Sequence, residues 1–101
     1  MRNQEVLEEV KSTLALLTAK APGRAIEVRV PPYAAVQCGD GPTHTRGTPP
    51  NVIEMDADTW LALAHGATNW AAAMQTGKIN ASGARADLSE YLPLAPNRIT
   101  P

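Results

Sequence analysis

The sequence contains no phenylalanine and only one cysteine, Cys38. A single thiol cannot form an internal disulfide, and no second cysteine or paired histidine stands at a metal-ligand spacing. These absences indicate a reducing, cytoplasmic location and no bound metal. With so few large aromatic side chains, alanine and leucine must fill most of the core.

The chain also lacks an excess of either charge and lacks a long apolar run. Nine Lys and Arg stand against ten Asp and Glu, a formal net charge of -1, with no basic cluster. Nucleic-acid binding and attachment to an anionic membrane surface both require such a cluster, so we expect neither. No stretch approaches the roughly 18 apolar residues of a membrane span. Glutamates at positions 5, 8 and 9 interrupt any N-terminal signal region.

Composition instead favours one globular domain. Hydrophobic residues make up 44% and charged residues 19% of the 101 positions, too apolar for a disordered chain. This length leaves no room for a second core. We therefore expect a single domain over residues 1–94 and a C-terminal tail over residues 95–101.

Hydrophobic periodicity predicts the elements of this domain. Apolar residues at helical spacing predict a helix over 3–20, and strict alternation predicts a strand over 25–30. Weaker patterns predict further strands at 33–38, 51–55 and 78–83, with 33–38 folding back as a hairpin. Helices are expected at 56–66, capped by Asp56 and stopped by Gly66, at 68–76, and from Arg85 or Asp87 to Tyr91. The order predicts an α+β fold, a mainly antiparallel sheet of about four to five strands with helices packed on one face.

The longest irregular stretch, residues 39–50, carries a candidate polar site. His44 and Arg46 stand two apart, so an extended backbone places both on one side, where they can bind a carboxylate or phosphate. Arg85 is a third candidate cation. The alternatives are a solvated loop for His44 and Arg46, and pairing with Asp87 or Glu90 for Arg85.

Two predicted helices carry a candidate apolar site. Trp60 and Leu63 on the first, with Trp70 and Met74 on the second, are suited to line a ligand cavity. The alternative is that these residues form an ordinary packed core. A nucleophilic Cys38 would need a nearby base such as His44 and a lowered pKa, whereas a buried thiol is the usual outcome.

The segments Asn51–Gly66 and Asn69–Gly83 resemble the second half of sterol carrier protein type 2 domains. In those domains a strand leads to an acidic helix cap, one short helix ends in glycine, and a second ends in Gly-Lys before a closing strand. The segments Gly41–Asn51 and Gly83–Leu94 look like the small actinobacterial sterol carrier family proteins. The resemblance implies a tunnel between sheet and helices for sterols, fatty acids or acyl chains, and no covalent cofactor. Larger members have a longer C-terminal helical region, so the implied pocket here is small or open.

Three functions remain open on this reading. The first is a non-enzymatic carrier of an apolar ligand, with Arg46 at the polar mouth of the cavity. The second is an accessory module that supplies His44 and Arg46 to a mycothiol-dependent isomerase-type partner enzyme, since similar folds occur in such enzymes. The third is an interaction domain without a small ligand. A second copy covering a free sheet edge is a further partner to test.

Overall fold

The computed structural model describes residues 3–41 and 50–94. Within these ranges the elements follow one another as α1 (Asn3–Lys20), β1 (Ile26–Val30), β2 (Ala34–Cys38), β3 (Val52–Glu54), α2 (Ala57–His65), α3 (Trp70–Gln75), β4 (Asn80–Ser82) and a 3-10 turn, η1 (Ser89–Tyr91). The predicted α+β class is confirmed.

The described strands form one mixed sheet in the order β2-β1-β3-β4. β1 pairs antiparallel with β2 through the predicted hairpin, and β3 pairs antiparallel with β4. β3 lies on the other side of β1 and runs parallel to it, with Val28 opposite Ile53. A mainly antiparallel sheet of about four strands is therefore confirmed, while the parallel pairing in its centre has no counterpart in the sequence patterns.

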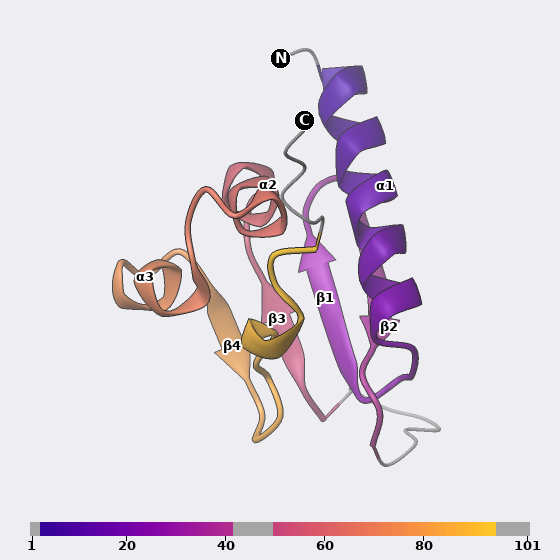
Figure 1. Ribbon diagram of the computed structural model, residues 1–101, viewed down its shortest axis with the longest axis vertical. Helices are drawn as coiled ribbons and strands as arrows, with labels where there is room; N and C mark the ends of the chain where they lie inside the picture. Colours follow the sequence, from indigo (N-terminus) through magenta and orange to yellow (C-terminus); the bar gives the residue numbers. More distant parts are fainter. Residues whose placement is uncertain (1–2, 42–49, 95–101) are drawn as a thin grey trace, which may run out of the picture.

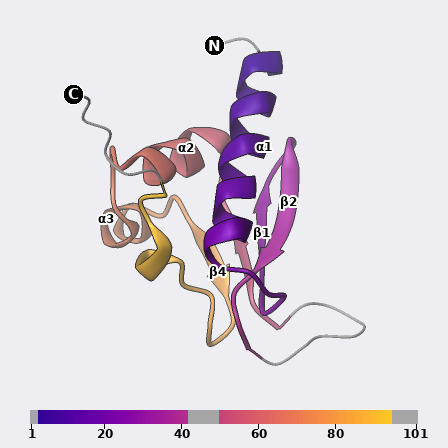
Figure 2. The same ribbon diagram turned by 45° about the vertical axis from the view of Figure 1, so that its right-hand side comes forward.

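Helices cover one face of this sheet. Ile26, Val28 and Val30 of β1 are buried, while Glu27 and Arg29 between them are partly exposed on the other face. The two ribbon views show that α1 runs beside β1 and β2, whereas α2 and α3 lie toward β3 and β4 (Figures 1 and 2). The core lies between these two layers, because the apolar side of each element faces the other layer.

Side-chain caps and glycine set the bounds of the second helix. Asp56 Oδ1 accepts a hydrogen bond from Thr59 N at 2.8 Å, and this bond lowers the pKa of Asp56. Gly66 ends the helix in the left-handed conformation, with φ of 82°. Both predicted signals are confirmed, because each acts within one turn of its own residue.

The expected last helix is wrong in extent and type. The structure forms only the 3-10 turn Ser89–Tyr91. Asp87 Oδ1 accepts from Ser89 N at 2.8 Å, which starts the turn, and Leu92 is already extended. A turn of three residues is too short to present an apolar α-helical face, so this segment is an irregular connection.

Candidate functional site

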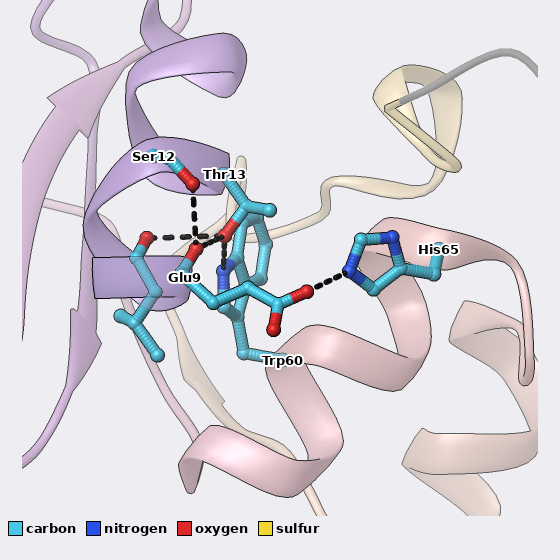
Figure 3. A network of polar contacts seen from close by, with 6 residues as sticks. Glu9, Ser12, Thr13, Trp60 and His65 are labelled. Carbon is cyan, nitrogen blue, oxygen red and sulfur yellow. Dashed lines mark hydrogen bonds and ion pairs between the residues drawn. The ribbon is translucent and has the colours of Figure 1, made fainter. Parts of the chain in front are cut away.

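Trp60 and Leu63, two of the predicted cavity residues, are fully packed into the core. Trp60 is 0% exposed, and its indole Nε1 donates to Thr13 Oγ1 on α1 at 2.8 Å. The Thr13 hydroxyl lies within bonding distance of the backbone oxygens of Glu9 and Val10, at 2.7 and 3.0 Å. Figure 3 shows this network between α1 and α2. Trp60 thus joins the two helices through packing and one buried hydrogen bond.

The other two predicted cavity residues lie on α3 and are more exposed. Trp70 is half-buried against the core, and Met74 is 42% exposed. Five surface hollows of residues 3–41 and 50–94 are lined by other residues than these four. Their role in ligand binding stays a prediction.

His44 and Arg46 lie in the segment 42–49, outside the described residues. Arg85, the third candidate cation, is described. Its Nη1 donates to the backbone oxygen of Asp40 at 2.9 Å, and the same atom lies against Gly41. The expected pairing with Asp87 or Glu90 is replaced by this contact across the molecule. Arg85 therefore lies beside Gly41, the last described residue before the 42–49 segment.

Asn51 holds Arg85 in this position, which the sequence patterns did not reveal. Asn51 is 5% exposed; its Nδ2 donates to Ala25 O and its Oδ1 accepts from Arg85 N, both at 2.8 Å. Gly83 passes so close to Pro50 and Asn51 that a side chain has no room there. A buried asparagine needs hydrogen-bond partners, and this need was the only signal in the sequence. It could not identify Ala25 and Arg85, because both lie far from Asn51 along the chain.

A hollow of about 320 Å³ lies beside Arg85. It opens between the beginning of β1, the end of β2 and the C-terminal segment, and its lining residues are Ile26, Gly39, Asp40, Arg85, Asp87, Ser89, Glu90 and Tyr91. Ile26 and Tyr91 are the apolar surfaces, and the charged groups are three carboxylates and one guanidinium. Its volume falls at the lower end of the range of ligand pockets, about 300 to 1,000 Å³.

Cys38 near the hollow and Tyr91 in its lining both keep their protons at neutral pH. Burial raises the pKa of the Cys38 thiol to about 11, so the thiol is protonated at neutral pH. Partial burial and the adjacent Glu90 carboxylate raise the pKa of Tyr91, whose phenol stays a hydrogen-bond donor. The interpretation of Cys38 as an ordinary buried thiol agrees with this environment.

A second hollow, of about 370 Å³, lies at the turn between β1 and β2. Its lining consists of Arg29, Pro31, Pro32, Tyr33, Ala34, Ala35 and Glu54. Arg29 and Glu54 belong to the face of the sheet without helices. Although Tyr33 and Ala34 pack against the core, this hollow extends over the face of the sheet without helices, so it is the weaker candidate.

His65 also has a partner that its position in the sequence did not predict. Its Nε2 lies 2.7 Å from Glu9 Oε2, which ties the end of α2 to α1 on the surface (Figure 3).

The described ranges hold no candidate for two other kinds of site. No three His, Cys, Asp or Glu side chains come together there as metal ligands. No helix among the described residues has the length and hydropathy to cross a membrane.

Comparison with known proteins agrees with the arrangement of sheet and helices. The model of a family described as "Bacterial SCP ortholog" matches residues 2–94. No curated protein matches the sequence. A closer grouping with the actinobacterial proteins stays a prediction. Since the family match spans nearly the whole chain, the protein belongs to the family of bacterial SCP orthologs, as the resemblance to sterol carrier proteins predicted.

Proposed function

We propose that this protein is a non-enzymatic carrier that binds one apolar chain, of the fatty-acid or acyl class, in the hollow beside Tyr91. The observation that carries the proposal is the position of this hollow. It adjoins the core at Ile26 of β1, which is 4% exposed, and Tyr91 forms its other apolar surface. Membership in the bacterial SCP family supports a lipid as the ligand.

Size and chemistry favour a single chain over a sterol. At about 320 Å³ the hollow is at the small end for ligand pockets, and it is open on one side. Ile26 and Tyr91 offer apolar contacts to the tail of an acyl chain, and its polar end can remain in water or meet the polar lining. The protonated Cys38 offers no covalent step, which is consistent with binding alone.

The predicted residues keep a place in this proposal. Trp60 and Leu63 are proposed to support the site from within the core. Trp70 and Met74 on α3 do not line the hollow, so a contact between them and the ligand is kept only as part of the proposal. His44 and Arg46 are proposed to meet an anionic head group. The contact of Arg85, which lines the hollow, with Gly41 supports this part of the proposal. A single domain over residues 1–94 is part of the same proposal.

The first experiment is native mass spectrometry of the purified full chain, followed by titration with cis-parinaric acid read through energy transfer from the two tryptophans. Co-purified lipid, or saturable transfer that palmitate displaces, would support the carrier. No lipid and no transfer would contradict it and favour the accessory module with His44 and Arg46.

A matched pair of variants locates the site. Tyr91→Ala removes the apolar wall of the proposed hollow and should weaken binding of the probe about tenfold, or about 1.4 kcal/mol. Tyr33→Ala removes an equally half-buried tyrosine from the second hollow and should leave the affinity unchanged. The reverse result would move the site to the β1–β2 turn.

A further inference from the structure

Residues 84–94, here called the strap, insert one leucine into the core. Leu88 is 0% exposed, although Asp87 and Ser89 on either side of it are exposed. Tyr91, Leu92 and Leu94 pack against the same core from its surface. Both ribbon views place η1 between α1 and α3, on the side of the sheet that carries the helices (Figures 1 and 2). Leu88 thus fills space between sheet and helices with a side chain from an irregular segment.

The middle of the strap has few polar attachments to the layers beneath it. The backbone N–H groups of residues 86, 87, 89, 91 and 92 donate to acceptors within residues 83–89. Its attachments to other elements are at Arg85, at Leu94, whose N donates to Ala64 O at 3.0 Å, and at two backbone oxygens that bind Lys20 of α1. A segment with mostly internal bonds can lift without breaking sheet pairing.

Lys20, the last residue of α1, holds the strap from one side. Its Nζ donates to the backbone oxygens of Tyr91 and Pro93, at 2.9 and 3.3 Å. Both bonds are exposed to solvent, so each is easily exchanged for water. Lys20 therefore acts as a latch of modest strength.

The strap also forms one wall of the hollow, through Arg85, Asp87, Ser89, Glu90 and Tyr91. Lifting the strap would join the hollow to the space that Leu88 fills. We propose that the strap is a gate that a ligand displaces: Leu88 occupies part of the apolar site, Lys20 latches it closed, and an acyl chain enters by replacing Leu88. This inference rests on the proposed carrier function.

Two variants should open the gate. When only the open fraction binds, the apparent dissociation constant is the intrinsic one divided by that fraction. A substitution that destabilises the closed strap raises the open fraction and therefore lowers the apparent dissociation constant. Leu88→Ala leaves an apolar space that stays dry and suits an apolar guest. Lys20→Met keeps the aliphatic stem and removes both bonds. Each variant should tighten the binding of cis-parinaric acid at least about threefold.

Each variant has a matched control. Leu14→Ala removes a leucine that is equally buried, on α1 rather than in the strap, and Lys11→Met changes an exposed lysine on the same helix. Neither should tighten binding. Equal tightening in a control and its partner variant would mean general loosening of the fold and would overturn the gate.

Hydrogen exchange of peptides covering residues 84–94 supplies the second readout. In the unliganded protein these amides should exchange faster in Lys20→Met than in the wild type. Saturation of the wild type with cis-parinaric acid should speed their exchange at least about tenfold relative to the sheet. Lys20→Met changes only a surface side chain, so it tests the gate even if Leu88→Ala does not fold.

The outcomes separate the gate from the carrier function. Binding by the wild type with no change in affinity or strap exchange in Lys20→Met would overturn the gate and leave the carrier standing. Absence of binding by the wild type and by both variants would overturn both.

Discussion

At the scale of single residues, burial differs sharply between the two tryptophans. Trp60 has no exposed surface and donates a buried hydrogen bond to Thr13, whereas Trp70 at the start of α3 is only half-buried. The apolar stripe of α1 contains Thr13 between Val10 and Leu14 because the indole N–H needs an acceptor there.

This difference predicts unequal costs of substitution. Trp60→Ala should lower the free energy of unfolding by about 3 to 5 kcal/mol, as for other large buried side chains. Trp70→Ala should cost about 1 to 2 kcal/mol, since less of it is packed. Urea unfolding followed by far-UV circular dichroism measures both. Equal losses would contradict the assignment of Trp60 to the core and Trp70 to its edge.

The thiol of Cys38 predicts a change of stability with pH. Its pKa rises from an ordinary value of 9.0 to about 11 in the folded protein, because burial disfavours the thiolate. The unfolded chain therefore releases this proton at lower pH than the folded protein. The free energy of unfolding should fall as pH rises from 9 toward 11.

Urea titrations at a series of alkaline pH values test this fall in stability. Cys38→Ala should show a shallower fall with pH than the wild type, since other groups still titrate. Parallel curves for the two proteins would show that Cys38 does not contribute.

At the scale of elements, the two glycines that flank β4, Gly77 and Gly83, allow the chain to enter and leave this strand. Gly83 follows β4 with φ of 113°, and a Cβ there would collide with Pro50 O and Asn51 Oδ1. Gly77, before β4, also has positive φ, 74°, but its Cβ would meet nothing within 4 Å. Both positions have a positive φ that disfavours other residues, but only Gly83 also lacks room for a Cβ.

Alanine at each position separates the two effects. Gly77→Ala should lower the free energy of unfolding by about 1 kcal/mol, the cost of the left-handed conformation alone. Gly83→Ala should cost clearly more, at least about 2 kcal/mol, because the strand and the Asn51 bonds must shift as well. Thermal and urea unfolding of both variants measure the difference. Similar costs would refute the close approach at Gly83.

At the scale of the whole molecule, one set of buried side chains links the described elements. The core cluster includes Leu14 of α1, Val28 of β1, Ile53 of β3, Trp60 of α2 and Leu88 of the strap. Because these elements bury their apolar sides against each other, none has a separate core.

A shared core predicts cooperative unfolding. Tryptophan fluorescence, which reports on Trp60, and far-UV circular dichroism should give coincident urea transitions, with a slope of about 1 kcal/mol per molar urea for a chain of this size. An early fluorescence change with intact secondary structure would contradict a single cooperative unit.

The sequence by itself determined the elements whose signals are local. The apolar stripe of α1, the alternation of β1, the cap at Asp56 and the stop at Gly66 each depend on residues within one or two turns, so their periodicity could be read directly. The family resemblance was likewise carried by this order of local signals.

Only the tertiary structure decided the contacts between distant segments. The parallel pairing of β1 with β3, the clamp of Asn51 on Arg85, and the burial of Leu88 join residues separated by more than twenty positions. No local periodicity encodes such partners, because they are selected by the packing of whole elements. The hollow beside Tyr91 exists for the same reason, because its lining joins residues 26–40 to residues 85–91.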